Sequence, residues 1–199
     1  GKLPSAAPEF IESRHRGILL KTKKSLKRLI GDSTEHNSLE YEETSGKRYN
    51  TMYLDSKDIP TIGIGFNLKE AGAKKRIENL GYNYNKVVSG KQRISNIHID
   101  TLFLEDVKTS VKEAKSVFSN FDSLPDNAAS VVTKMIFQLG LPRFKGFKEF
   151  IKAVKKQDWD KAAKEILTST KKDGTIVKSP FHKQVPARAK RLAKQITGK

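Results

Sequence analysis

The sequence of 199 residues predicts a mostly helical α+β fold in which a long helix joins two lobes. Two short apolar runs at 51–54 and 61–66 flank a Ser-Lys-Asp turn, which predicts a β-hairpin in a small α+β lobe at 36–93. Apolar residues then recur at helical spacing along 94–119, which predicts a bridging helix. Every later apolar pattern is helical, so a helical lobe is expected at 120–199.

Residues 1–35 are expected to form a separate basic extension, mostly helical. Pro4 and Pro8 mark an irregular start, and apolar residues within 18–30 are spaced for an amphipathic helix among Lys and Arg. Gly31 is expected to end this helix. Two interpretations stay open: the helix packs on the main body or trails from it, or it docks on a virion, a partner protein or a membrane surface.

A short helix is expected at 36–43, and it carries the acidic residues Glu40, Glu42 and Glu43. Leu39 and Glu43 are four residues apart and therefore share one helix face. A carboxyl group held behind an apolar residue is a candidate for a raised pKa. This pattern singles out Glu43 from the acidic cluster.

The hairpin is expected to bring a carboxylate and a hydroxyl together. Asp55 closes the first strand and Thr61 opens the second, so both side chains belong to the same end of the hairpin. Gly63 and Gly65 alternate with isoleucines, which predicts a second strand with one face free of side chains. Such a face lets a ligand or another backbone approach closely, and the pattern therefore predicts a cleft.

The chain after the hairpin is predicted to be helical with two irregular segments. Helical patterns are found in six stretches, at 71–80, 94–119, 126–139, 147–154, 159–166 and 186–196. Asp158 is expected to cap one of these helices and Pro186 to open the last. Residues 81–90 are expected to be a connection, and 171–179 a polar loop with a turn at 171–174.

Composition narrows the function classes. The formal charge is +17, and residues 141–199 alone hold seventeen Lys/Arg against five Asp/Glu, a net of +12. This surface favours polyanions, of which nucleic acids and bacterial envelopes are examples, while plain solvation by basic helix faces is the alternative. The absence of cysteine excludes disulfides and thiolate chemistry. No apolar run is long enough to span a bilayer or to serve as a signal peptide.

Several segments together carry a resemblance to a known family. The stretch Tyr53-x-Asp55-x5-Thr61-Ile-Gly-Ile-Gly65 resembles the hairpin of phage-type lysozymes, the muramidases typified by the T-even bacteriophage enzyme (glycoside hydrolase family 24). Further similar segments follow in the same order, at 94–95, 102–107, 135–140, 159–163 and 186–191. The resemblance covers about residues 36–197 of this chain. It implies a lysozyme-like catalytic domain at 36–199.

The resemblance also implies roles for individual residues. Glu43 corresponds to the general acid, Asp55 to the second carboxylate and Thr61 to a hydroxyl that positions water. Arg188 matches an arginine of the last helix that supports the catalytic Glu. Phe137 and Gln138 are expected to line the cleft, with Phe137 as a pure core residue the alternative. Asn67 is assigned to substrate binding as well, and neither a metal nor a cofactor is expected.

The sequence departs from the family pattern at several positions. Residues 44–50 hold about three extra residues between the acid and Asp55, which keeps Glu40 and Glu42 open as alternative acids. A histidine is typical after the last hairpin glycine and pairs with an aspartate on the bridging helix; this chain has Phe66, so Asp106 needs another partner. The polar loop at 171–179 has the character of an insertion.

The expected function is hydrolysis of peptidoglycan between N-acetylmuramic acid and N-acetylglucosamine, with inversion, by a monomeric phage endolysin or virion-associated lysozyme. The expected partners are peptidoglycan and the anionic bacterial envelope, and no nucleic acid. The protein is expected to be made in the cytoplasm of a bacterial host and to act on the periplasmic cell wall. Two alternatives stay open: a lysozyme-fold scaffold that binds without catalysis, and the lytic module of a larger virion or toxin protein.

Overall fold

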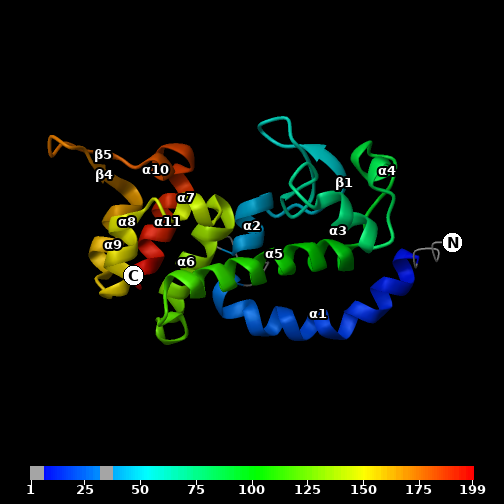
Figure 1. Cartoon of the computed structure of the whole chain (residues 1–199), viewed down its shortest axis with the longest axis horizontal. Helices are drawn as coiled ribbons and strands as arrows, with labels where there is room; N and C mark the ends of the chain where they lie inside the picture. The colour runs from blue at the N-terminus through cyan, green and yellow to red at the C-terminus, as the bar shows by residue number, and fades with distance from the viewer. Residues whose placement is uncertain (1–6, 32–37) are drawn as a thin grey trace. The chain divides into compact units, whose positions relative to one another are not determined.

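The computed structural model describes residues 7–31 and 38–199 (Figure 1). The described chain is mostly helical with two small antiparallel sheets, which confirms the predicted lysozyme-like α+β fold class. It divides into two compact units. The first holds the described residues of 7–27 and 38–106, and the second holds 28–31 and 107–199.

The first unit contains the hairpin and the helices around it. Its elements are α1 (Pro8–Ile30, whose last residues belong to the second unit), α2 (Leu39–Thr44), β1 (Tyr49–Leu54), β2 (Pro60–Gly63), β3 (Phe66–Asn67), α3 (Ala73–Asn79), α4 (Tyr84–Val88) and the first half of α5 (Asn96–Val117). The predicted short helix at 36–43 is observed as α2, and residues 36 and 37 lie outside the described part. As predicted, Gly31 follows the end of α1, with a left-handed φ of 77°.

The predicted second strand is wrong in its length. Residues 61–66 do not form one strand, because β2 ends at Gly63 and the chain turns back into β3. Gly63 and Gly65 have φ values of 65° and 69°, which glycine adopts without the steric cost that a Cβ brings. The two glycines therefore form a tight turn and not the bare strand face that was expected. A Cβ on Gly63 would lie 2.9 Å from Ile99 Cγ2 of α5, so the turn packs directly on that helix.

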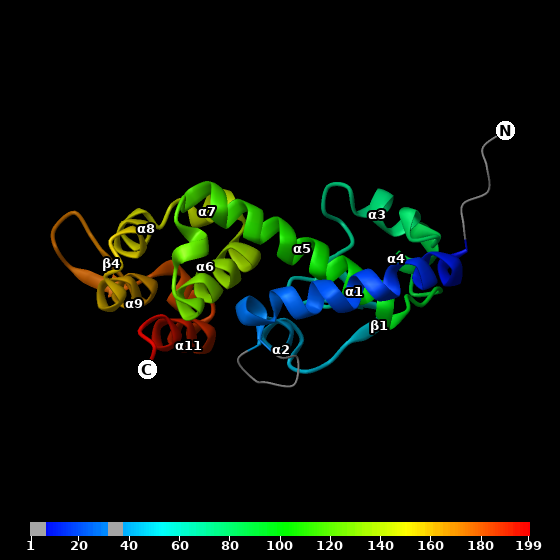
Figure 2. The ribbon, with the colours of Figure 1, turned by 90° about the horizontal axis from the view of Figure 1, so that it is seen from below.

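The core of the first unit lies between the small sheet and the helices. The residues that fill it are buried and apolar: Leu39, Ile62, Leu68, Ile77, Val87, Ile94 and Ile99. Leu26 of α1 is also buried, so the N-terminal helix packs on this unit. Both ribbon views show α1 passing the first half of α5 (Figures 1 and 2).

The second unit is built around a buried helix. Its elements are the second half of α5, a 3₁₀ turn at Phe121–Ser123, α6 (Asp126–Leu139), α7 (Leu141–Phe144), α8 (Lys148–Lys155), α9 (Trp159–Leu167), β4 (Thr168–Thr170), β5 (Ile176–Lys178), α10 (Pro180–Gln184) and α11 (Pro186–Ile196). Ten of the residues of α6 are buried. Helix α11 packs against both α6 and α9, as Figure 2 also shows.

Two local predictions in this unit can be compared with the structure. Asp158 caps α9, since its side chain accepts a 3.1 Å hydrogen bond from the backbone N–H of Lys161, as predicted. The predicted polar loop at 171–179 is largely a hairpin, because β4 and β5 pair on either side of the predicted turn. Within the described residues, no helix has the length and apolarity that crossing a membrane would require.

Candidate functional site

Helix α2 is short and is held at both ends by its own side chains. At its start the Ser38 hydroxyl accepts a 3.1 Å hydrogen bond from the backbone N–H of Tyr41. At its end the Thr44 hydroxyl donates a 2.9 Å bond to the carbonyl of Glu40, and Ser45 follows in the left-handed conformation with φ 52°. These caps satisfy backbone groups that a helix terminus leaves unpaired. They fix Glu43 in the last turn of the helix.

The Glu43 carboxylate points towards the hairpin. Its Oε2 atom lies 3.2 Å from the position that a Cβ on Gly65 would occupy. Leu39, four residues earlier on α2, is fully buried, as the sequence pattern predicts. Glu43 is therefore backed by the core on one side and faces the glycine turn on the other.

Asp55 is fixed just beyond the end of β1. One of its carboxylate oxygens accepts hydrogen bonds from the backbone N–H groups of Lys57 (2.8 Å) and Ile59 (2.9 Å). The backbone N–H of Asp55 in turn donates to the carbonyl of Ile59 at 3.1 Å. The side chain thus closes the turn of the hairpin and has little freedom to move.

Thr61 lies in β2 with its side chain buried. Its hydroxyl donates a 2.8 Å hydrogen bond to the carbonyl of Ile59, which leaves the oxygen able to accept a bond. Its backbone is opposite Tyr53 on β1 and Asn67 on β3. The Asn67 side chain accepts a 2.7 Å bond from the N–H of Lys69, so it stabilises the turn that follows β3.

Tyr53 lies within electrostatic range of both carboxylates, and the sequence did not single it out beyond its place in the motif. Burial raises the pKa of the Tyr53 phenol, and electrostatic interactions with Tyr49, Glu43 and Asp55 raise it further. Both carboxylates therefore lie within electrostatic reach of this one side chain. The Tyr49 and Tyr53 rings are stacked with their centroids 4.0 Å apart. Glu43 and Asp55 thus both act electrostatically on Tyr53, whose backbone pairs with that of Thr61 across β1 and β2.

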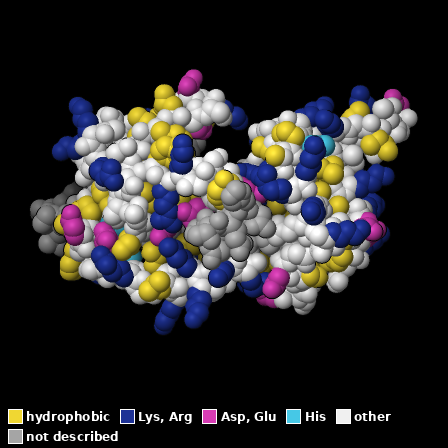
Figure 3. All heavy atoms as spheres, turned by 180° about the vertical axis from the view of Figure 1, so that it is seen from behind, with side chains coloured by type: hydrophobic (Ala, Val, Ile, Leu, Met, Phe, Trp, Pro, Cys, Tyr) yellow, Lys and Arg dark blue, Asp and Glu magenta, His cyan; other side chains and the backbone are white. Residues whose placement is uncertain are grey.

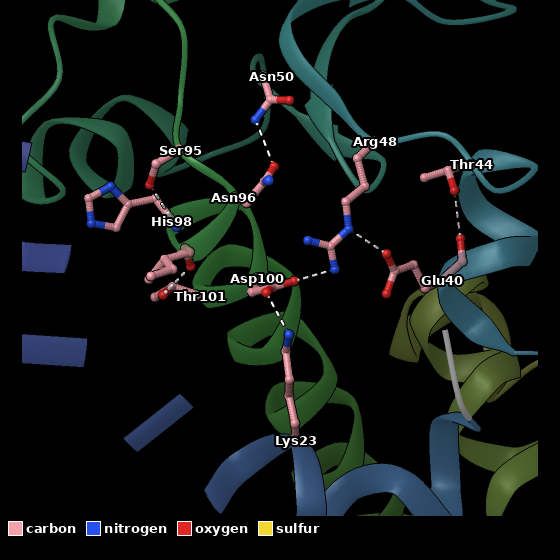
Figure 4. A network of polar contacts seen from close by, with 11 residues as sticks. Lys23, Glu40, Thr44, Arg48, Asn50, Ser95, Asn96, His98, Asp100 and Thr101 are labelled. Carbon is pink, nitrogen blue, oxygen red and sulfur yellow. Dashed lines mark hydrogen bonds and ion pairs between the residues drawn. The ribbon is translucent and has the colours of Figure 1, made fainter. Parts of the chain in front are cut away.

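Among the alternative acids, Glu40 is engaged elsewhere. It forms a 2.7 Å ion pair with Arg48, and that arginine also binds Asp100 of α5 (Figure 4). Burial acts to lower the pKa of Arg48, but the hydrogen bonds and charges of Glu40 and Asp100 raise it more, so the pKa is raised overall. Glu40 therefore has a structural partner, whereas Glu43 is the acid that reaches the hairpin glycine.

The remaining predicted site residues belong to the second unit. Arg188 of α11 donates a hydrogen bond from Nη1 to the side-chain oxygen of Gln138 on α6. Gln138 and its neighbour Phe137 are both half-buried. Two of the predicted residues of this unit are therefore in direct contact.

Asp106, whose partner the sequence leaves open, forms an ion pair with Arg76. Arg76 of α3 binds it at 2.7 Å and also lies over the Phe66 ring, 4.9 Å from the centroid. Burial raises the pKa of Asp106 although Arg76 acts to lower it. Asp106 is thus paired with an arginine that itself lies over Phe66. Among the described residues, no cluster of three or more acidic or histidine side chains could hold a metal ion.

Comparison with known proteins finds one family and several relatives within it. A model of the phage lysozyme family matches residues 43–186. "Probable T4-type lysozyme 1" of Dictyostelium discoideum is 28% identical over 130 residues, which cover 60% of this chain and 75% of the relative. "Probable T4-type lysozyme 2" of the same organism is 26% identical over 149 residues, which cover 71% and 82% respectively. The matched region begins at Glu43, so α1 precedes it.

Proposed function

The chain belongs to the phage lysozyme family, and from this premise we propose that it is a peptidoglycan hydrolase. Its reaction is cleavage of the β-1,4 bond between N-acetylmuramic acid and N-acetylglucosamine. The observation that carries the proposal is the grouping of Glu43, Asp55 and Thr61 around Tyr53 in the first unit. Two carboxylates at one site are what glycoside hydrolysis needs.

The three side chains divide the work of the reaction. Glu43 acts as general acid and donates a proton to the oxygen of the leaving sugar. Asp55 acts as the ionised partner, and its two backbone hydrogen bonds keep it in place while it orients a water molecule and takes a proton from it as the water attacks the anomeric carbon. Thr61 accepts a hydrogen bond from that water, because its own proton is already donated to Ile59. Attack by a water held in this way inverts the anomeric configuration.

The basic surface supports an anionic partner. Lys and Arg number 39 against 22 Asp and Glu, and Figure 3 shows basic side chains spread over the face in view. Peptide stems and envelope phosphates of bacterial cell walls carry negative charge. We therefore extend the proposal to a phage endolysin or virion lysozyme that acts on the periplasmic cell wall. Added salt screens such contacts, and the rate on cell walls is expected to fall as the NaCl concentration rises.

The decisive experiment measures the release of reducing sugars from purified peptidoglycan. Glu43→Gln is expected to lower the rate by about 10³-fold, since it removes the proton donor, while circular dichroism shows an intact fold. The matched control is Glu42→Gln, which changes the neighbouring acid of the same helix and keeps the activity. Loss of activity in the control alone would assign the acid to Glu42, and no release by the parent protein would leave a binding scaffold.

The glycine turn offers a second, steric test. Gly65→Ala places a methyl group 3.2 Å from Glu43 Oε2, whereas Gly72→Ala meets nothing within 4 Å. Both positions have a left-handed φ, 69° and 81°, so both variants carry similar backbone strain. Only Gly65→Ala is expected to lose activity beyond its loss of stability. Equal activity of the two folded variants would contradict the direction assigned to Glu43.

A further inference from the structure

Four charged side chains of the first unit form a continuous network (Figure 4). Arg48 donates from Nε to Glu40 at 2.7 Å and from Nη2 to Asp100 at 2.6 Å. Lys23 of α1 binds the other oxygen of Asp100 at 2.6 Å. The network therefore runs from α1 through α5 to α2, and both Asp100 oxygens have a cationic partner.

The centre of the network is shielded from water. The Asp100 side chain is 7% exposed and that of Glu40 is 15% exposed, whereas Lys23 at 44% lies at the edge. Two cations and two carboxylates balance each other. Removal of one member of such a buried set leaves a charge without compensation, which is far more costly than loss of an exposed pair.

The network holds the helix that carries Glu43. Helix α2 has six residues, too few to persist without tertiary contacts. Glu40 lies three residues before Glu43 on α2, and Arg48 is the last residue of the connection that leads from α2 to β1. Arg48 therefore braces this connection by joining both it and α2 to Asp100 of α5.

The contribution of α1 comes from outside the family match. That match begins at residue 43, while Lys23 belongs to the preceding helix. Leu26 on the same helix is buried, so α1 is fixed where Lys23 can reach Asp100. With Lys23 removed, Arg48 would have to offset the charges of Asp100 and Glu40 by itself within this network, and its hold on Glu40 would weaken.

We propose that Arg48 and Lys23 are positioning residues that keep Glu43 aligned for catalysis through Asp100 and Glu40. This inference rests on the proposed hydrolase function, with Glu43 as the acid. The N-terminal helix α1 then contributes to catalysis, because its Lys23 helps to hold Glu43 in position. A shift of the acid by about 1 Å is enough to lower a catalytic rate by one to two orders of magnitude.

The test separates alignment from stability by measuring kcat and KM on soluble peptidoglycan strands, at a temperature at which every variant is folded by circular dichroism. Arg48→Met is expected to lower kcat about tenfold with KM changed by less than about twofold. Lys23→Met is expected to lower kcat by a smaller factor, and Lys23→Arg is expected to restore it. The matched control is Arg28→Met on the same helix, whose pair with Asp126 is exposed and whose kcat should not change.

Each outcome decides the question. Unchanged kcat in folded Arg48→Met and Lys23→Met overturns the proposal and leaves the network a purely structural role. If Arg48→Met does not fold, Lys23→Met and its Arg rescue decide alone. Failure of the proposed function has a different signature. Either the parent protein would show no hydrolysis, or folded Glu43→Gln would be as active as the parent.

Discussion

Two arginines of the first unit each join a neighbouring segment to α5, and the two clusters differ in charge balance. Arg48 binds Asp100 on α5 and Glu40 on α2. Arg76 of α3 binds Asp106 six residues further along α5. The first cluster sits beside the helix of the proposed acid, and the second sits behind the hairpin at Phe66.

The balanced cluster has two cations for two carboxylates, because Lys23 supplements Arg48. In the other cluster Arg76 is shared by three carboxylates, Asp106 at 2.7 Å, Glu105 at 2.9 Å and Glu70 at 3.5 Å. The consequence is visible in the acids: burial raises the pKa of Asp106, and burial followed by the charge of Asp106 raises the pKa of Glu70. The single arginine does not offset the effect of burial on the pKa values of Asp106 and Glu70. The comparison predicts that the two clusters respond differently to mutation and to pH.

The largest effect is expected from breaking the balanced cluster. Arg48→Met leaves Glu40 without its cation and Asp100 with Lys23 alone, in a mostly buried place. The free energy of unfolding, measured with urea, should fall by about 3 kcal/mol. A loss below about 1 kcal/mol, the size typical of a surface pair, would show that the network is not effectively buried.

A smaller loss is expected when the second cluster is broken. Arg76→Met removes the cation beside three carboxylates and its contact with the Phe66 ring, but these acids are more exposed and can be solvated or protonated. The free energy of unfolding at pH 7 should fall by about 1.5 kcal/mol. Unlike Arg48→Met, this variant should regain stability at pH 4.5. An equal loss at both pH values would contradict the difference between the clusters.

The pH dependence of the unbalanced cluster sharpens the comparison. The folded protein holds protons on Asp106 and Glu70 more tightly than the unfolded chain, whose values are near 3.8 and 4.5. These groups therefore make the free energy of unfolding decrease as the pH rises from about 4 through their folded-state pKa values. Asp106→Asn should reduce this decrease by less than about 1 kcal/mol, because the side chain is 34% exposed. The exposed Asp122→Asn is the control, and equal pH profiles for the two variants would refute the assignment.

The smallest effect is expected at His98 of α5, and its sign is opposite. Burial lowers the pKa of His98, and His15 lowers it as well. The carboxylates of Glu12 and Glu9 act to raise it, but the effect of burial is larger. The unfolded chain thus binds a proton more readily below about pH 6.5, and the free energy of unfolding falls as the pH falls through this range. His98→Gln should reduce this decrease in the free energy of unfolding by about 0.5 kcal/mol, with unfolding measured between pH 5 and 7. A steeper slope in the variant would contradict the burial argument.

Much of the fold could be predicted because long amphipathic helices have a local signature. The apolar spacing identified α5, α6 and α11, and Asp158 identified the start of α9. The short helices α4, α7 and α10 were missed, since helices of four or five residues leave no periodic pattern. The turn at Gly63 and Gly65 was mistaken for a strand, because alternation with isoleucine is the strand pattern whether or not the glycines adopt a positive φ.

The residues of the site also divide into those that a local sequence pattern identifies and those that it does not. Asp55 and Thr61 could be placed together from the hairpin alone, and the direction of Glu43 follows from its face shared with Leu39. The contact of Arg48 with Asp100 spans 52 positions and that of Lys23 spans 77, and no local pattern encodes either. A charged residue at such a position has the same sequence signature as a solvated one. Their partners could be recognised only in three dimensions.

The spacing of the two carboxylates along α5 has a consequence for variation of the chain length. Asp100 and Asp106 are separated by six residues, which places them about 120° apart around the helix axis. Insertion or deletion of a single residue between them would rotate one carboxylate by about 100° relative to the other. One of the arginines would then lose its anchor. The interval 100–106 should therefore tolerate substitutions at its solvent-facing positions but no change in length.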